Sequence, residues 1–106
     1  MVNDPFGSEI SEEIEDVMST LDAGSKEVLR LLLKYGEMTE RVARSKVEAS
    51  RKFASGTLLL IGLENRTGWL VKTQSSPHPH VSRDEDRFKL APNIQPYLAA
   101  WFDKHH

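Results

Sequence analysis

The chain has 106 residues, of which 39% are hydrophobic and 28% are charged, and it contains no cysteine. This length fits one domain with a modest core, and the lack of cysteine excludes disulfides, thiolate metal ligands and cysteine nucleophiles. The longest apolar run, residues 58–63, is much shorter than the ~18 residues of a membrane span, and the acidic start of the chain does not match a secretory signal. We therefore expect a cytoplasmic protein that does not enter a membrane.

The net charge of −2 is divided unevenly along the chain. Residues 1–27 contain eight acidic residues and one basic residue, whereas residues 28–106 contain eight acidic and thirteen basic residues. The first part therefore carries a charge of −7 and the second part a charge of +5. Because nucleic-acid binding depends on the local potential, the basic second part is compatible with DNA binding despite the negative total.

Residues 1–9 are expected to form a flexible arm, since they include a proline and a glycine, and residues 10–104 are expected to form one domain. Residues 11–21 predict an amphipathic helix, with Ser11 as its cap and acidic residues in its first turn. Its apolar face consists of Ile10, Ile14, Val17, Met18 and Leu21. This face must be covered by the rest of the domain or by a second subunit.

A second helix is predicted over residues 26–35, where apolar residues occupy most of the circumference. A helix that is apolar on nearly every side is usually buried, so this one should lie at the centre of the core. Either Asp22 or Ser25 can cap its start, and Gly36 should end it.

Residues 38–71 predict two short helices joined by a tight turn and followed by a strand. In the first helix, apolar residues recur at helical spacing on one side and basic residues lie on the other. Ser50 is the predicted cap of the second helix, whose buried stripe begins at Phe53 and which should end at Gly68. Because the second helix is apolar on more than one side, only its first two turns could be presented to a partner.

Two β-strands are predicted next, over residues 69–74 and 87–91, because apolar and polar residues alternate in both. With the twelve residues between them they should form a β-hairpin. The loop contains Asp84, Glu85 and Asp86, which we interpret as a solvent-exposed acidic run. A last helix follows, with Pro96 in its first turn.

Four runs of sequence resemble winged-helix repressors of the arsenic-repressor (ArsR) type: LDAGSKEVLRLLLKYGEMT, VARSKVEAS, LENRTGWLVK and FKLAP. Together they cover most of residues 10–104. The resemblance implies a mainly α fold with a small β-hairpin, which is a winged helix-turn-helix flanked by helices on both ends. It also implies a transcriptional regulator that binds double-stranded DNA.

In the resembled family, the second helix of the pair lies in the major groove with its first residues facing the bases. The resemblance therefore places the first turns of the helix starting at Ser50 against bases, and the basic side of the preceding helix against phosphates. The hairpin loop is acidic at its tip, unlike the basic loop common in the family, which leaves Lys72, Arg83, Arg87 and Lys89 as weaker candidates. The residues assigned to DNA binding are Arg41, Arg44, Lys46, Ser50, Arg51, Lys52, Ser55, Lys72 and Arg87. The alternative is that these are ordinary surface charges.

In the resembled family the first and last helices commonly form a dimer interface, and aromatic residues are frequent in such patches. The residues assigned to a homodimer interface are Ile10, Ile14, Val17, Met18, Tyr97, Leu98, Trp101 and Phe102. The alternative is that the last helix closes the core of a single chain.

The sequence indicates a non-enzyme without a cofactor, because its glycines do not fit a nucleotide-binding loop and its paired acids lie in a helix start and a loop. His78, His80, His105 and His106 could ligate a metal, but they lack the spacing of a closed tetrahedral site, so no metal site is predicted. The last two are also typical of a purification tag. The alternative function is a winged-helix protein–protein interaction module without direct DNA binding, which the acidic loop and the apolar second helix favour.

Overall fold

The computed structural model describes residues 5–53 and 58–105, with side chains from residue 9 onward. This part of the chain is mainly helical and contains a small three-stranded antiparallel sheet, which confirms a mainly α fold with little β-structure. The elements are α1 (Pro5–Met18), α2 (Ala23–Tyr35), β1 (Glu37–Thr39), α3 (Glu40–Ser50), α4 (Leu59–Thr67), β2 (Leu70–Gln74), β3 (Arg87–Leu90) and α5 (Gln95–Lys104).

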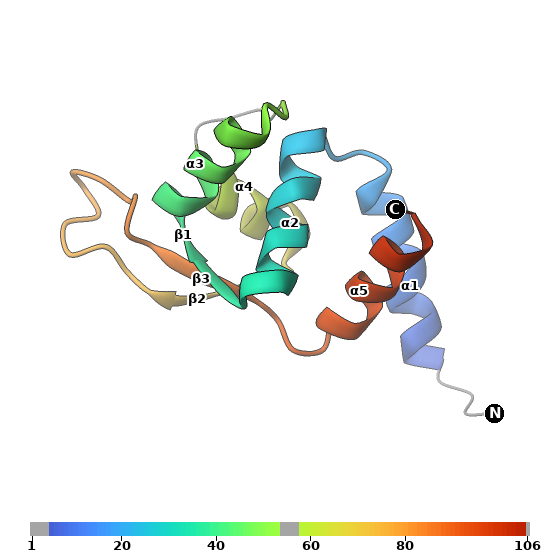
Figure 1. The fold of residues 1–106 in the computed structure, drawn as a ribbon. Coiled ribbons are helices and arrows are strands. Elements are labelled where there is room, and N and C mark those ends of the chain that lie inside the picture. Colours follow the sequence, from blue (N-terminus) through green and yellow to red (C-terminus); the bar gives the residue numbers. More distant parts are fainter. Residues whose placement is uncertain (1–4, 54–57, 106) are drawn as a thin grey trace.

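Helix α2 lies at the centre of the molecule and contacts α3, α4, α5 and the sheet (Figure 1). The Asp22 side chain caps its start by accepting a 2.7 Å hydrogen bond from the Ser25 N–H. Gly36 ends it with φ +88°, a value that glycine adopts without a steric penalty. The predicted central helix is therefore confirmed and begins three residues earlier than expected.

Helix α1 begins at Pro5, so the prediction that Ser11 caps this helix is wrong. Proline suits the first helical position because its missing N–H has no partner to lose there. Residues 5–9 of the expected arm are accordingly helical. The helix ends at Met18, after which the Ser19 and Thr20 hydroxyls donate to the carbonyls one turn back.

The sheet has the strand order β1-β3-β2. The pairing of β2 with β3 confirms the predicted hairpin, and Leu70 lies opposite Leu90. Strand β1 was not predicted, because three residues are too few to show an alternating pattern. Its Met38 lies opposite Phe88, and both side chains are buried in the core.

The link between α3 and α4 differs most from the prediction. Ser50 is the last residue of α3 rather than the cap of the next helix, and its hydroxyl donates to the Val47 carbonyl at 2.9 Å. Arg51 then ends α3 in the left-handed conformation, with φ +57°. Helix α4 begins at Leu59, and Phe53, the predicted start of its buried stripe, is 71% exposed. Gly68 ends α4 as expected, with φ +71°.

The two ends of the molecule are built differently (Figure 1). Helices α1 and α5 pack together at one end, and the loop between β2 and β3 projects from the opposite end of a molecule whose longest extent is 50 Å. Residues 75–86, between β2 and β3, form the hairpin loop. Among the described residues, no helix has both the length and the apolar character needed to cross a membrane.

Candidate nucleic-acid interface

Glu40, the first residue of α3, holds the start of α4. Its side chain is fully buried, and its two carboxylate oxygens accept hydrogen bonds from the backbone N–H groups of Leu59 at 2.8 Å and Leu60 at 2.9 Å. Leu58 occupies the N-cap position and has no side-chain acceptor for these N–H groups. Glu40 therefore supplies the cap, and its negative charge lies at the positive end of the α4 dipole.

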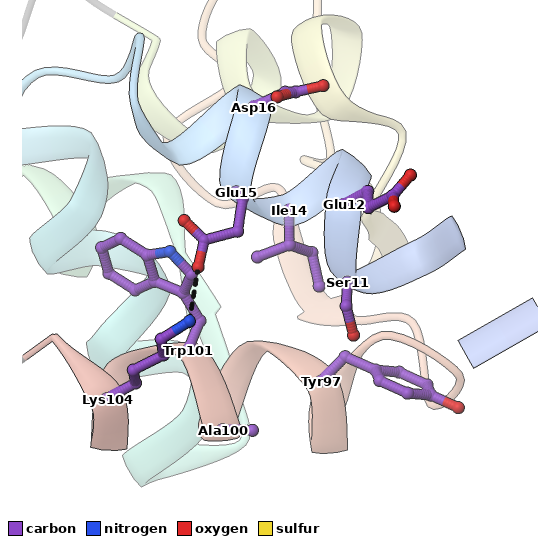
Figure 2. A pocket seen from close by; sticks show the side chains of 9 residues that line it. All are labelled: Ser11, Glu12, Ile14, Glu15, Asp16, Tyr97, Ala100, Trp101 and Lys104. Carbon is purple, nitrogen blue, oxygen red and sulfur yellow. Dashed lines mark ion pairs between the residues drawn. The ribbon is translucent and has the colours of Figure 1, made fainter. Parts of the chain in front are cut away.

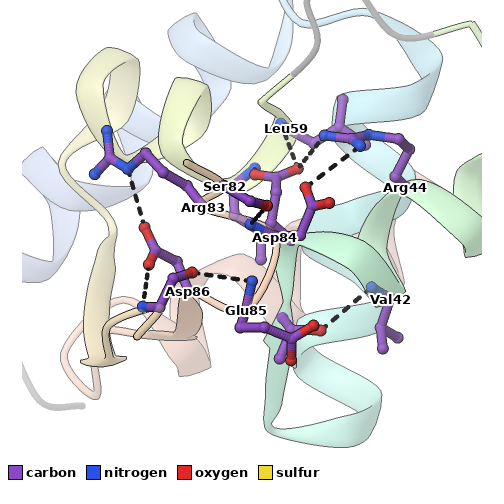
Figure 3. Close-up of polar contacts among 12 residues, drawn as sticks. Val42, Arg44, Leu59, Ser82, Arg83, Asp84, Glu85 and Asp86 are labelled. Carbon is purple, nitrogen blue, oxygen red and sulfur yellow. Dashed lines mark hydrogen bonds and ion pairs between the residues drawn. The ribbon is translucent and has the colours of Figure 1, made fainter. Parts of the chain in front are cut away.

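The hairpin loop is joined to the same turn of α3 through its backbone. The Glu40 N–H donates to the Asp86 carbonyl at 3.0 Å, and the Arg41 N–H donates to the Asp84 carbonyl at 2.9 Å. The Thr39 hydroxyl accepts from the Val42 N–H at 3.3 Å (Figure 3). The first N–H groups of a helix have no acceptor within the helix. Three of those at the start of α3 therefore find their acceptors in the loop and in Thr39.

Asp86 organises the loop from inside. It is fully buried, and its carboxylate accepts from the Ser76 N–H at 2.7 Å and from Arg83 Nε at 3.2 Å (Figure 3). Lys72 Nζ lies 3.8 Å from the same carboxylate. Burial alone would raise the pKa of Asp86, but the Ser76 hydrogen bonds, the charge of Lys72 and the Arg83 hydrogen bond outweigh it and hold the pKa below its ordinary value. Asp86 is therefore ionised at neutral pH, and its interpretation as a solvent-exposed residue is wrong.

These contacts bring the starts of α3 and α4 and the hairpin loop together at one end of the molecule. Three of the predicted DNA-binding cations lie there, and each faces an acid of the loop: Arg41, Arg44 and Lys72. Arg41 Nε lies 2.9 Å from Glu85 Oε1. Arg44 Nη1 lies 3.5 Å from Asp84 Oδ1 (Figure 3). Arg44 also lies 3.9 Å from the Glu40 carboxylate.

The ion-paired groups at this end of the molecule are equal in number of cations and carboxylates. The cluster, which we call the wing-end cluster, contains four cations and four carboxylates. They are Arg41, Arg44, Lys72, Arg83, Glu40, Asp84, Glu85 and Asp86. Arg87 is half-buried in β3 beside it, and its Nε is buried without a hydrogen-bond partner among residues 5–53 and 58–105.

Four more of the predicted DNA-binding residues lie further along α3 or directly after it. Lys46 Nζ lies over the Tyr35 ring, 4.8 Å from its centroid. Ser50, Arg51 and Lys52 are at the far end of this eleven-residue helix, about 15 Å from its start. Ser55 lies outside the described residues. The predicted residues therefore do not form one continuous positive face, and the prediction that the second helix starts at Ser50 is wrong.

Lys52 is engaged by a third buried carboxylate, Glu27 of α2. Glu27 is 4% exposed and forms ion pairs with Arg30 and Lys52, whose side chains are about half exposed. Burial alone would raise the pKa of Glu27, but the hydrogen bonds and positive charges of its two partners outweigh it and lower the pKa. Lys52 thus serves the contact between α2 and the end of α3.

Three of the predicted dimer-interface residues are buried within the chain's own core: Ile14, Met18 and Leu98. For these three the dimer assignment is wrong, because α1 packs on α5 of the same chain. The remaining five are partly buried and pack against that core: Ile10, Val17, Tyr97, Trp101 and Phe102. Association of two copies through their exposed parts stays a prediction.

An open groove of about 350 Å³ runs between α1 and α5 (Figure 2). Tyr97 and Trp101 line it from α5, and Glu15 of α1 reaches across to Lys104, with 3.6 Å between the charged atoms. Trp101 stacks on His105, with 4.2 Å between ring centroids, and its indole N–H is buried without a hydrogen-bond partner in the described part of the chain.

The histidines do not gather into a site. His78 and His80 are exposed on the hairpin loop, with their ring centroids 6.3 Å apart. Among the described residues, no group of three or more histidine, aspartate or glutamate side chains could hold a metal ion. His106 lies outside these residues.

Comparisons with known proteins do not assign the chain to a family. No protein-family model matches the sequence, and neither the curated proteins nor the solved structures give a match. The candidate site therefore depends on the geometry of this chain alone. That geometry depends on Glu40, Asp86 and Glu27, none of which was predicted as a site residue. The one available signal for Glu40 was its place directly after Thr39, a good helix cap.

Proposed function

We propose that the chain is a winged-helix DNA-binding regulator that docks through the wing-end cluster. One observation carries the proposal: Glu40 and the loop backbone bring the start of α3, the start of α4 and the hairpin loop to one end of the molecule. These are the elements that face DNA in the winged-helix proteins that the sequence resembles. The order of α2, β1, α3, α4 and the hairpin in the chain supports the same proposal.

In this proposal Arg41 and Arg44 bind phosphates and fix the register of the protein on the duplex. Their side chains are 65% and 37% exposed, so both can reach a ligand from solvent. Helix α4 buries Leu59, Leu60, Ile61 and Leu63, which leaves few of its residues for reading bases. Contacts to the DNA backbone therefore dominate the proposed interface.

The test is a fluorescence-anisotropy titration of random-sequence duplex DNA at two salt concentrations. We expect micromolar binding that weakens steeply with salt. R41A/R44A should weaken binding and reduce the slope of log K against log salt by about 2, since each lost phosphate contact reduces it by about 1. R51A/K52A is the matched control: it removes the same charge from the other end of α3 and should keep the slope of the parent.

Absence of binding at low salt, with the helical circular-dichroism spectrum intact, would contradict the proposal. Equal effects of the two double variants would contradict the placement of the interface at the wing end, because the two pairs of cations lie at opposite ends of α3.

A second candidate function is a winged-helix protein–protein interaction module. The balanced charge of the wing-end cluster favours it, because a surface on which each cation already faces a carboxylate attracts a polyanion weakly. A folded protein that does not bind DNA at low salt would support this function.

A further inference from the structure

We propose that Asp84 and Glu85 compete with DNA phosphates for Arg41 and Arg44, and that these two acids set how tightly the protein binds DNA of any sequence. The inference rests on the proposed DNA-binding function. It adds two affinity-determining residues on the hairpin loop, at positions where the resembled proteins often carry basic residues.

The geometry of the two ion pairs carries this inference. Glu85 Oε1 lies 2.9 Å from Arg41 Nε, and Asp84 Oδ1 lies 3.5 Å from Arg44 Nη1. A guanidinium group binds carboxylate and phosphate oxygens through the same N–H donors. Each acid therefore occupies donors that a phosphate would need.

The acids keep their positions without the arginine side chains. The loop is attached to α3 by the hydrogen bonds of the Asp84 and Asp86 carbonyls with backbone N–H groups. The Glu85 N–H donates to the Ser76 hydroxyl at 3.1 Å, and the Asp86 carboxylate accepts a hydrogen bond from the Ser76 N–H. When an arginine turns to a phosphate, the released carboxylate therefore stays nearby and repels that phosphate.

The pairs are also accessible enough to exchange. The Arg41 and Glu85 side chains are 65% and 49% exposed, and ion pairs of this kind contribute little to stability. Binding to DNA therefore replaces each pair at a modest cost. A released carboxylate also takes up a cation from solution, which offsets part of the counterion release that drives binding to DNA.

The experiment compares the parent protein with D84N/E85Q against the same random-sequence duplex at several salt concentrations. The amides keep the size of the acids and remove two negative charges. We expect D84N/E85Q to bind on the order of tenfold more tightly, as the loss of two competing exposed pairs implies. The slope of log K against log salt should become steeper, because no cation is taken up.

The matched control is E12Q/E13Q, which removes the same charge from exposed positions of α1, at the opposite end of the molecule (Figure 1). It should bind like the parent. Adding R41A/R44A to D84N/E85Q should abolish the gain, because the freed guanidinium groups are its cause. A thermal melt of each variant establishes that the fold is retained.

Tighter binding by D84N/E85Q than by E12Q/E13Q supports the inference, including the case in which the parent does not bind detectably. If the parent binds and the two double variants behave alike, the competition is absent, and the proposed DNA-binding function still stands. If neither the parent nor D84N/E85Q binds at low salt, both the inference and the proposed function are overturned.

Discussion

The two ends of α3 are each fixed by a buried carboxylate, but the partners of the two carboxylates differ. At the wing end, Glu40 accepts from the backbone N–H groups of Leu59 and Leu60. At the other end, Glu27 binds the side chains of Arg30 and Lys52, which are about half exposed. A backbone N–H can leave its acceptor only if the helix start unfolds, whereas a lysine side chain can turn into solvent.

This difference separates a rigid end of α3 from an adjustable one. The wing end fixes the relative positions of two helices and a loop, as a docking surface for a regular ligand such as a duplex requires. The other end finishes with Arg51 in the left-handed conformation, which is unfavourable for a side chain with a β-carbon. We expect substitutions at the wing end to cost more stability than substitutions at the other end.

The largest effect is expected from Glu40→Ala. It leaves two buried N–H groups without an acceptor, each of which costs about 1–3 kcal/mol, so the free energy of unfolding should fall by about 3 kcal/mol. Glu40→Gln keeps one acceptor oxygen and should lose roughly half as much. Urea unfolding followed by circular dichroism measures both.

The control for Glu40→Ala is Glu48→Ala, which removes an exposed carboxylate from the same helix. It should change the free energy of unfolding by less than about 0.5 kcal/mol. Similar losses from both variants would mean that Glu40 does not cap α4.

Asp86→Asn should have the next largest effect, a loss of about 2 kcal/mol at neutral pH, because Arg83 and Lys72 then face a neutral amide. The stability that Asp86 contributes should depend on pH. The pKa of Asp86 is lower in the folded state than in the unfolded chain, so the ionised group stabilises the fold above the unfolded pKa of about 4. This stabilisation is lost as the pH falls through the folded pKa.

The difference in unfolding free energy between the parent and Asp86→Asn should therefore be constant from pH 7 to about pH 5 and shrink below about pH 4. Glu27 also has a lowered pKa, but it is present in both proteins and cancels in the difference. Chemical unfolding at a series of pH values measures this. A difference that stays constant down to pH 2.5 would show that the Asp86 charge does not stabilise the fold.

The sequence correctly predicted the helices and strands whose caps, glycines and apolar patterns lie within the element itself. The leucines of α2, its Asp22 cap and Gly36 lie within one segment, and so do Gly68 and the alternating residues of the hairpin. The start of α4 could not be found in this way, because its cap lies 19 residues earlier in the chain. Ser50 has the chemistry of a helix cap, but its hydroxyl donates to a carbonyl of the preceding turn.

The candidate site was predicted less well than the fold, because charge was judged one segment at a time. Arg41 and Arg44 were correctly placed on α3, and Asp84 and Glu85 in the hairpin loop. That these four residues face one another follows from the backbone contacts of Glu40 and Arg41 with the loop, which no periodicity reveals. An acidic run next to an expected DNA-binding element is better treated as a partner for its cations than as a solvent-exposed segment.

The smallest effect is expected from Lys52→Met, at the adjustable end of α3. Lys52 is 45% exposed, and Glu27 keeps Arg30 as a partner, so the free energy of unfolding should fall by less than about 1 kcal/mol. Lys26→Met is the matched control, since the described residues give Lys26 no ion pair, and urea unfolding compares the two. A loss from Lys52→Met as large as that from Glu40→Ala would mean that both ends of α3 are held equally firmly. The wing end would then have no special rigidity, and its proposed use as a docking surface would depend on the positions of Arg41 and Arg44 alone.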